Sequence, residues 1–135
     1  MSQLINEVTK QFMGPNSNLS VKSGDTVKIY QKIKEGSKER IQIFQGLVIR
    51  TDNNSSHLFR ITVRRIASGV GVEKSFLVNS PLVSRIEILR RSKVRRNYLS
   101  YMRQRTGKAA RLSSIDFDKV KVNNVINTVP AEITK

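Results

Sequence analysis

Hydrophobic and polar residues alternate in five short stretches of this chain, and this pattern predicts five β-strands. The stretches are Asp25–Ile33, Arg40–Arg50, Leu58–Ile66, Val72–Val78 and Val83–Leu89. Residues that favour turns, mainly Gly, Asn, Ser and Pro, separate them. Several short strands with regular turn signals indicate a mainly β fold, either a small antiparallel barrel or a sandwich. A barrel suits so small a core because closure removes exposed strand edges.

The second stretch contains an irregularity. Ile41 and Ile43 lie on one face of it, whereas Phe44, Gly46 and Val48 lie on the other. This change of face near Phe44–Gly46 predicts a β-bulge, because glycine inside a strand often marks one.

The two ends of the chain have other patterns. Ser2 can cap a short N-terminal helix that ends at Gly14-Pro15. Its apolar face consists of Leu4, Ile5, Val8 and Phe12. Near the C-terminus, a mild alternation in 115–122 predicts an extended segment that lies on another surface.

Cationic residues are concentrated in one run of the chain, RRSKVRRNYLSYMRQRTGKAAR, and no Asp or Glu occurs between Glu87 and Asp116. The cations of this run are Arg90, Arg91, Lys93, Arg95, Arg96, Arg103, Arg105, Lys108 and Arg111. So many like charges repel one another, and contact with a polyanion relieves that repulsion. A solvated helix usually mixes charges of both signs along a face, so the run indicates a nucleic-acid binder.

Apolar side chains interrupt the basic run at a helical spacing: Tyr98, Leu99, Tyr101 and Met102. The run is therefore expected to be partly helical. Tyr98 and Tyr101 fit two roles, which are stacking on unpaired bases and pinning the short helix to the barrel.

Composition narrows the choice of partner. The chain has 135 residues, which is the size of one domain, and a net charge of +15. Such a charge favours nucleic acid or an anionic membrane surface. No apolar run approaches the roughly 20 residues of a membrane-spanning helix, so we expect no membrane partner. The first 13 residues lack the basic and apolar regions of a signal peptide, and we expect the protein to act in the compartment where it is made.

Residues for catalysis or metal binding are scarce. The chain has no cysteine and one histidine, His57, which excludes thiolate sites and leaves little for a histidine-based site. Asp116 and Asp118 form a D-x-D pair, but Phe117 and Lys119 beside them favour a strand edge. We therefore expect no enzymatic activity, no metal and no cofactor.

Gly69-Val70-Gly71 does not continue into a dinucleotide-binding motif, because Lys74 stands where the third glycine is required. A tight turn is the simpler interpretation. Arg64, Arg65 and Lys74 flank this turn, whose backbone N–H groups can approach a phosphate.

Three segments together resemble the family of bacterial-type large-subunit ribosomal protein number nineteen: SGDTVKIYQKIKEGSKERIQIFQGLVI, FRITVRRIASGVGVEKSFLVNSPLV and RIEILRRSKVRRNYLSYMRQRTGKAAR. The resemblance covers Val21–Leu112. Its most specific part is the pattern KVRRxxLxYxRxRxGKAAR, which starts at Lys93.

This resemblance implies an SH3-like barrel in residues 21–90 and a basic RNA-binding arm in 91–112. Residues 1–20 are then a helix and linker, and 113–135 are an extension. It also implies a structural constituent of the large ribosomal subunit, in the cytoplasm or in an organelle that encodes it. The protein would bind large-subunit ribosomal RNA near the subunit interface, help bridge to small-subunit ribosomal RNA, and neighbour the third and fourteenth large-subunit proteins.

Carried over by position, the family's RNA contacts fall on Lys93, Arg95, Arg96, Arg103, Arg105, Lys108 and Arg111, with Arg64, Arg65 and the turn of residues 69–74 in the matching barrel loop. Arg90, Arg91 and Tyr98 complete the predicted interface. Two features depart from the family pattern, namely the non-basic loop Asp52–Ser56 and the 23 residues after Leu112. The alternatives are a stand-alone SH3-like nucleic-acid-binding module in transcription or RNA metabolism and, third, an enzyme that acts on RNA.

Overall fold

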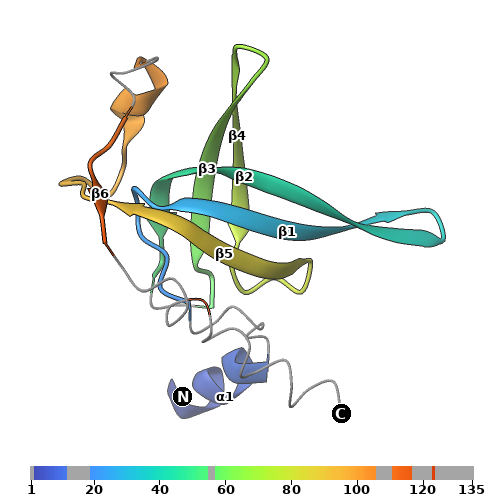
Figure 1. The fold of residues 1–135 in the computed structure, drawn as a ribbon. Helices are drawn as coiled ribbons and strands as arrows, with labels where there is room; N and C mark the ends of the chain where they lie inside the picture. Colours follow the sequence, from blue (N-terminus) through green and yellow to red (C-terminus); the bar gives the residue numbers. More distant parts are fainter. Residues whose placement is uncertain (1, 12–18, 55–56, 106–110, 117–122, 124–135) are drawn as a thin grey trace.

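The computed structural model describes residues 2–11, 19–54, 57–105, 111–116 and 123 (Figure 1). Its elements are α1 (Ser2–Gln11), β1 (Thr26–Glu35), β2 (Lys38–Asp52), β3 (Arg60–Ala67), β4 (Val70–Leu77), β5 (Val83–Ser92), the 3-10 helix η1 (Ser100–Arg103) and β6 (Ser114–Ile115). The five strands expected from hydrophobic alternation are confirmed, with their ends shifted by at most three residues. The short N-terminal helix is confirmed as well.

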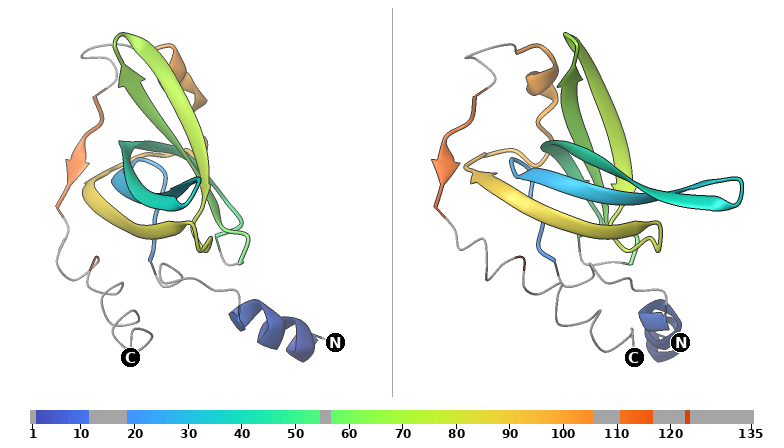
Figure 2. Two further views of the ribbon diagram at one scale, coloured as in Figure 1. Left: turned by 90° about the vertical axis from the view of Figure 1, so that its right-hand side faces the viewer. Right: turned by 45° about the vertical axis from the view of Figure 1, so that its right-hand side comes forward.

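All six strands belong to one antiparallel arrangement with the order β4-β3-β2-β1-β5-β6. Figures 1 and 2 show that the sheet curls into a half-barrel, which confirms the predicted mainly β, SH3-like fold. The longest strand, β2, connects its two halves. From Lys38 to Leu47 it pairs with β1, and from Leu47 to Asp52 it pairs with β3.

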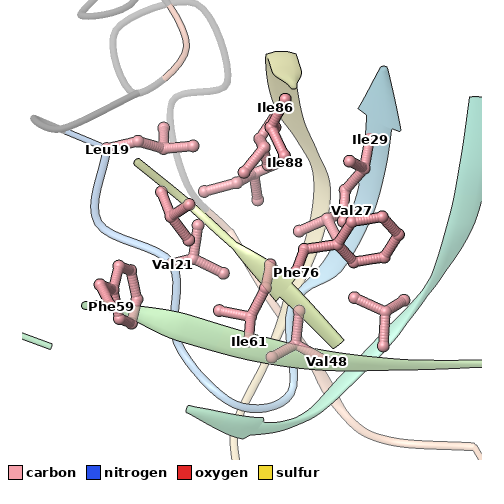
Figure 3. Close-up of a cluster of buried hydrophobic side chains, with 13 residues drawn as sticks. Leu19, Val21, Val27, Ile29, Val48, Phe59, Ile61, Phe76, Ile86 and Ile88 are labelled. Atoms are coloured by element: carbon pink, nitrogen blue, oxygen red, sulfur yellow. The ribbon is translucent and has the colours of Figure 1, made fainter. Parts of the chain in front are cut away.

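The main hydrophobic core lies on the concave side of this sheet (Figure 3). Alternate residues of the strands reach it, as the period of two requires. Val27, Ile29, Val48, Ile61, Val63, Ile86 and Ile88 are all 0% exposed. The Phe44 and Phe76 rings meet beside them at a centroid distance of 5.7 Å. Burial of each such side chain stabilises the fold by about 1.5–3 kcal/mol.

The bulge in β2 lies elsewhere than predicted. The β1–β2 register is continuous through Phe44–Gly46, whereas the β2–β3 register shifts between Val48 and Arg50. The unpaired residue is therefore Ile49. Gly46 has a different reason to be glycine, since a Cβ there would stand 2.5 Å from the carbonyl oxygen of Arg64 on β3. Close approach of two strands, not a bulge, explains this glycine.

The ends of the chain differ in their contacts. The apolar face of α1 is exposed, with Leu4, Ile5 and Val8 at 65%, 60% and 52%. Phe12 and the predicted helix stop at Gly14-Pro15 lie outside the described residues. In the part of the chain that the structure describes, no helix is long and apolar enough to cross a membrane.

Part of the C-terminal extension runs along the outer edge of β5. Ile115 of β6 pairs with Arg91, and Ser114 pairs with Ser92. The side-chain amide of Asn123 accepts a hydrogen bond from the Ile88 N–H (3.0 Å) and donates one to the Ile88 carbonyl (3.2 Å). The predicted extended segment is thus observed at its start, and residues 117–122 lie outside the description.

We expect Gly46→Ala to lower the free energy of unfolding by about 2 kcal/mol, because the new methyl group would force β2 and β3 apart. Urea denaturation would measure the change. Gln42→Ala, an exposed position on the same strand, is the control and should change stability by less than about 0.5 kcal/mol. Equal effects of the two substitutions would contradict the close-approach explanation.

Candidate nucleic-acid interface

The basic arm is attached to the barrel by a buried ion pair at its start. Asp25 is 0% exposed, and its two carboxylate oxygens accept hydrogen bonds from Arg91 at 3.1 and 3.2 Å. The backbone N–H of Lys22 donates a third at 2.9 Å. Burial raises the pKa of Asp25 above its usual value, and the hydrogen bonds of Arg91 oppose that rise. Arg91 thus faces the barrel, and its predicted RNA contact stays a prediction.

Asn97 provides a second attachment. Its amide donates to the Thr51 carbonyl (2.9 Å) and accepts from the Thr51 hydroxyl (2.7 Å). The Ser23 hydroxyl donates to the backbone carbonyl of Asn97. These bonds join the arm to both β2 and the segment before β1. Sequence reasoning did not single out Asn97, because a lone polar residue in a basic run has no distinctive signal.

The bulge in β2 supplies the third attachment. Ile49 has no ladder partner on β3, and its carbonyl accepts a hydrogen bond from the Leu99 N–H at 2.7 Å. Ile49, Leu99 and Met102 form a second hydrophobic cluster, and all three are buried. The predicted apolar stripe is therefore confirmed as an anchor, although the expected helix is only the single turn η1.

Tyr98 and Tyr101 lie against arginines of the protein itself. The guanidinium carbons of Arg50 and Arg103 lie 5.0 and 5.3 Å from the centroid of the Tyr98 ring. Those of Arg96 and Arg105 lie 5.8 and 4.5 Å from the centroid of the Tyr101 ring. Contacts of this kind contribute about 0.5–1 kcal/mol each at exposed sites. Of the two roles considered, the structure places both rings in the organisation of the arm, and base stacking by Tyr98 stays a prediction.

Glu73 on β4 links the β3–β4 hairpin to the arm. It accepts hydrogen bonds from Arg103 at 2.7 and 3.0 Å and from Arg64 at 2.9 Å. The two bonds from Arg103, and then the one from Arg64, hold the pKa of Glu73 below its usual range. The hydrogen bond with Glu73, and to a smaller extent the interaction with Tyr98, raises the pKa of Arg103, which is therefore charged at any physiological pH.

Asp52 organises a further pair of arginines that sequence reasoning missed. It accepts from Arg50 at 3.0 Å and from Arg60 at 3.2 Å. Arg50, Arg60, Tyr98 and Arg103 line a polar cavity of about 330 Å³, together with the two carboxylates Asp52 and Glu73. The cationic surface thus extends from the arm onto β2 and β3. Strand alternation gives the only signal for it, since Arg60 lies between the buried residues Phe59 and Ile61 and therefore faces outward.

Four of the predicted contacts converge on one shallow cavity of about 380 Å³, namely Lys93, Arg95, Arg96 and Arg105. All four are exposed. Among the described residues, none of the ion pairs involves them. This cluster, called the cationic face below, is available for an anionic partner.

The other predicted residues are dispersed. Lys74 donates to the Gln31 side chain at 2.7 Å, and Arg90 donates to the Leu112 carbonyl at 2.9 Å. Arg65 and Arg111 are exposed, and Lys108 lies outside the described residues.

Nothing in the described ranges forms a metal-ligand cluster of three or more His, Asp or Glu residues. His57 is half-buried, and its backbone carbonyl accepts from the Asn79 amide at 3.2 Å. Asp116 is exposed, whereas Asp118 lies outside the description. The arrangement offers cations and hydrogen-bond donors, which suit the binding of phosphates.

Comparison with known proteins gives a consistent result. Residues 3–115 match the family described as Ribosomal protein L19. The chain is 54% identical to large ribosomal subunit protein bL19 of Mycoplasma mobile over 94 residues, which cover 70% of this chain and 80% of that protein. It is 51% identical to bL19 of Mycoplasmopsis pulmonis over 108 residues, covering 79% and 87%. Against bL19 of Clostridium botulinum strain Loch Maree it is 54% identical over 89 residues, covering 66% and 77%.

We expect Asn97→Ala to lower the free energy of unfolding by about 1–3 kcal/mol, because the buried Thr51 hydroxyl and carbonyl lose their partner. Chemical denaturation would measure the loss. Asn54→Ala, in an exposed loop, is the matched control. Thr51→Val should cost less when Asn97 is already Ala, since the two residues share the bonds. Additive effects would contradict the attachment described here.

Proposed function

Since the chain belongs to the ribosomal protein L19 family, we propose that it binds large-subunit ribosomal RNA through its basic arm, near the interface with the small subunit. As a member of this family it is a structural component of the large ribosomal subunit and not an enzyme. The observation that carries the RNA proposal is the cationic face, with four exposed cations around one cavity.

Electrostatics supports this function. Each phosphate that the arm neutralises releases counterions, which favours binding at low salt. Arginine suits the task because its planar guanidinium binds phosphate in a bidentate way and also stacks on bases. The anchors at Asn97 and Leu99 hold the cationic face in a defined position on the barrel. Less conformational freedom is then lost when RNA binds.

The proposal extends to neighbours in the ribosome. Small-subunit ribosomal RNA across the interface, and the third and fourteenth large-subunit proteins, are the proposed partners. Exposed apolar residues on two hairpins, Ile41 and Val70 at 57% and 64%, support contacts with neighbouring proteins. The family match ends at residue 115, which supports the division into arm and extension.

The function predicts how the tagged protein sediments in a sucrose gradient. The wild-type chain should stay with large subunits after a high-salt wash. Arg95→Gln/Arg96→Gln should wash off at lower salt, because it loses phosphate contacts and with them affinity. Each lost contact should also make the slope of log K against log salt shallower by about 0.7–0.9. The control Lys32→Gln/Lys34→Gln removes the same charge from exposed positions of β1 and should dissociate only at a higher salt concentration than Arg95→Gln/Arg96→Gln does. A wild-type protein that stays at the top of the gradient would overturn the proposal.

Glu73 offers a test in the opposite direction. We expect Glu73→Gln to raise RNA affinity several-fold at low salt and to steepen the salt dependence, because Arg64 and Arg103 no longer share a carboxylate. Filter binding with a large-subunit RNA fragment would measure both quantities. Glu39→Gln, which removes a carboxylate at the hairpin of β1 and β2, is the control. Lower affinity of Glu73→Gln would mean that this carboxylate positions the arginines for RNA.

A further inference from the structure

A larger cavity opens where β2, β3 and the arm meet. Its volume is about 630 Å³, within the roughly 300–1,000 Å³ of pockets that hold small organic molecules. Ile43 and Leu47 of β2, Ile66 of β3 and Met102 of the arm form its apolar part. It is distinct from the cationic face, with which it shares only Arg105.

The apolar part of this cavity is incompletely covered. Ile43 is 46% exposed and Ile66 is 55% exposed, although both belong to regular strands. Apolar surface left in water costs about 25 cal/mol for each Å² that a ligand could cover. A flat, apolar face would recover that free energy.

The polar part of the cavity is cationic. Arg64, Arg65 and Arg105 line it, and no Asp or Glu is among the described residues that do so. Two of these guanidinium groups are held in place, since Arg64 donates to Glu73 at 2.9 Å and Arg105 lies 4.5 Å from the ring centroid of Tyr101. Guanidinium planes stack on bases and bind phosphates.

Hydrogen-bonding groups lie beside the apolar part. The side-chain amide of Gln45 offers both a hydrogen-bond donor and an acceptor, and so does the Thr26 hydroxyl. An amide can pair with the edge of a base, as side-chain amides do in specific RNA recognition.

We propose that this cavity binds an unstacked nucleotide of the RNA. The face of its base would lie on the isoleucines and arginines, and its phosphate would lie on the arginines at the rim. The inference rests on the proposed function, because it assigns a site for that same RNA. Three arginines without a lining carboxylate favour a polyanion over a protein segment, and the base is the part of RNA that carries a flat apolar face.

The test uses the full chain and two RNA hairpins that differ only in one bulged nucleotide, 2-aminopurine. We expect about tenfold tighter binding of the bulged hairpin, which corresponds to about 1.4 kcal/mol and lies within the range for one stacked base. Its fluorescence should change on binding, since the bulged base enters a new environment.

Ile66→Ser should abolish the preference for the bulged hairpin, while affinity for the paired hairpin and its salt dependence stay unchanged. Ile43→Ser is a second, independent variant with the same expected result. Both residues are about half exposed, so neither change should unfold the protein, and circular dichroism would check this. Val70→Ser lies on the β3–β4 hairpin outside the cavity and should keep the preference.

Equal binding of both hairpins by the wild type, with ordinary salt dependence, would overturn the base site and leave the proposed function standing. A preference that survives both isoleucine substitutions would also overturn it, and the apolar surface would then belong to a protein contact. If neither hairpin binds at low salt, the RNA-binding function is overturned together with the site.

Discussion

The contact between the bulge of β2 and the arm is the interaction on which the rest of the interface depends. Val48 and Ile49 are neighbours in sequence but serve two clusters, because successive strand residues point to opposite faces. Val48 fills the main core, and Ile49 packs against Leu99 and Met102. The bulge also leaves the Ile49 carbonyl free for the Leu99 N–H. A self-repelling arm is thus held by apolar burial and backbone bonding, which salt and bound phosphate do not weaken.

Carboxylates divide the cations into two classes. Asp25 accepts from Arg91, Asp52 from Arg50 and Arg60, and Glu73 from Arg64 and Arg103. These three acids hold five arginines in ion pairs and offset part of their charge. The cationic face is formed by the cations that these pairs leave over. Within the described residues, the cationic face therefore consists of cations that form no ion pair with a carboxylate.

Much of the fold could be predicted because its determinants are local. Alternation in 58–66 places Phe59, Ile61 and Val63 inside, and the structure has them at 6%, 0% and 0% exposure. The basic run was equally visible, since charge needs no neighbour to be recognised. The bulge was misplaced because Gly46 carries the same sequence signal for a bulge and for a close approach. Only the position of Arg64 on β3 distinguishes the two.

The contacts of the candidate site were less predictable because they join residues far apart in sequence. Glu73 meets Arg103 across 30 positions, and Asn97 meets Thr51 across 46. Neither Glu73 nor Asn97 stands out from its neighbours in the sequence, so neither could be assigned a partner from the sequence alone. The pattern of the chain identified the arm as cationic, but which cations face the barrel depended on partners supplied by other strands.

Anchoring also determines how the arm can bind. A free basic segment loses conformational entropy on binding, at about 1–2 kcal/mol for each ordered backbone residue. Here folding itself orders the segment from Asn97 to Arg103, through the bonds to Thr51 and Ile49 and the burial of Met102. The barrel therefore acts as a rigid support that holds arginines at fixed separations. For the RNA binding proposed above, such a support would select RNA whose phosphates and unpaired bases match those separations, so shape would add selectivity to an attraction that charge alone leaves non-specific.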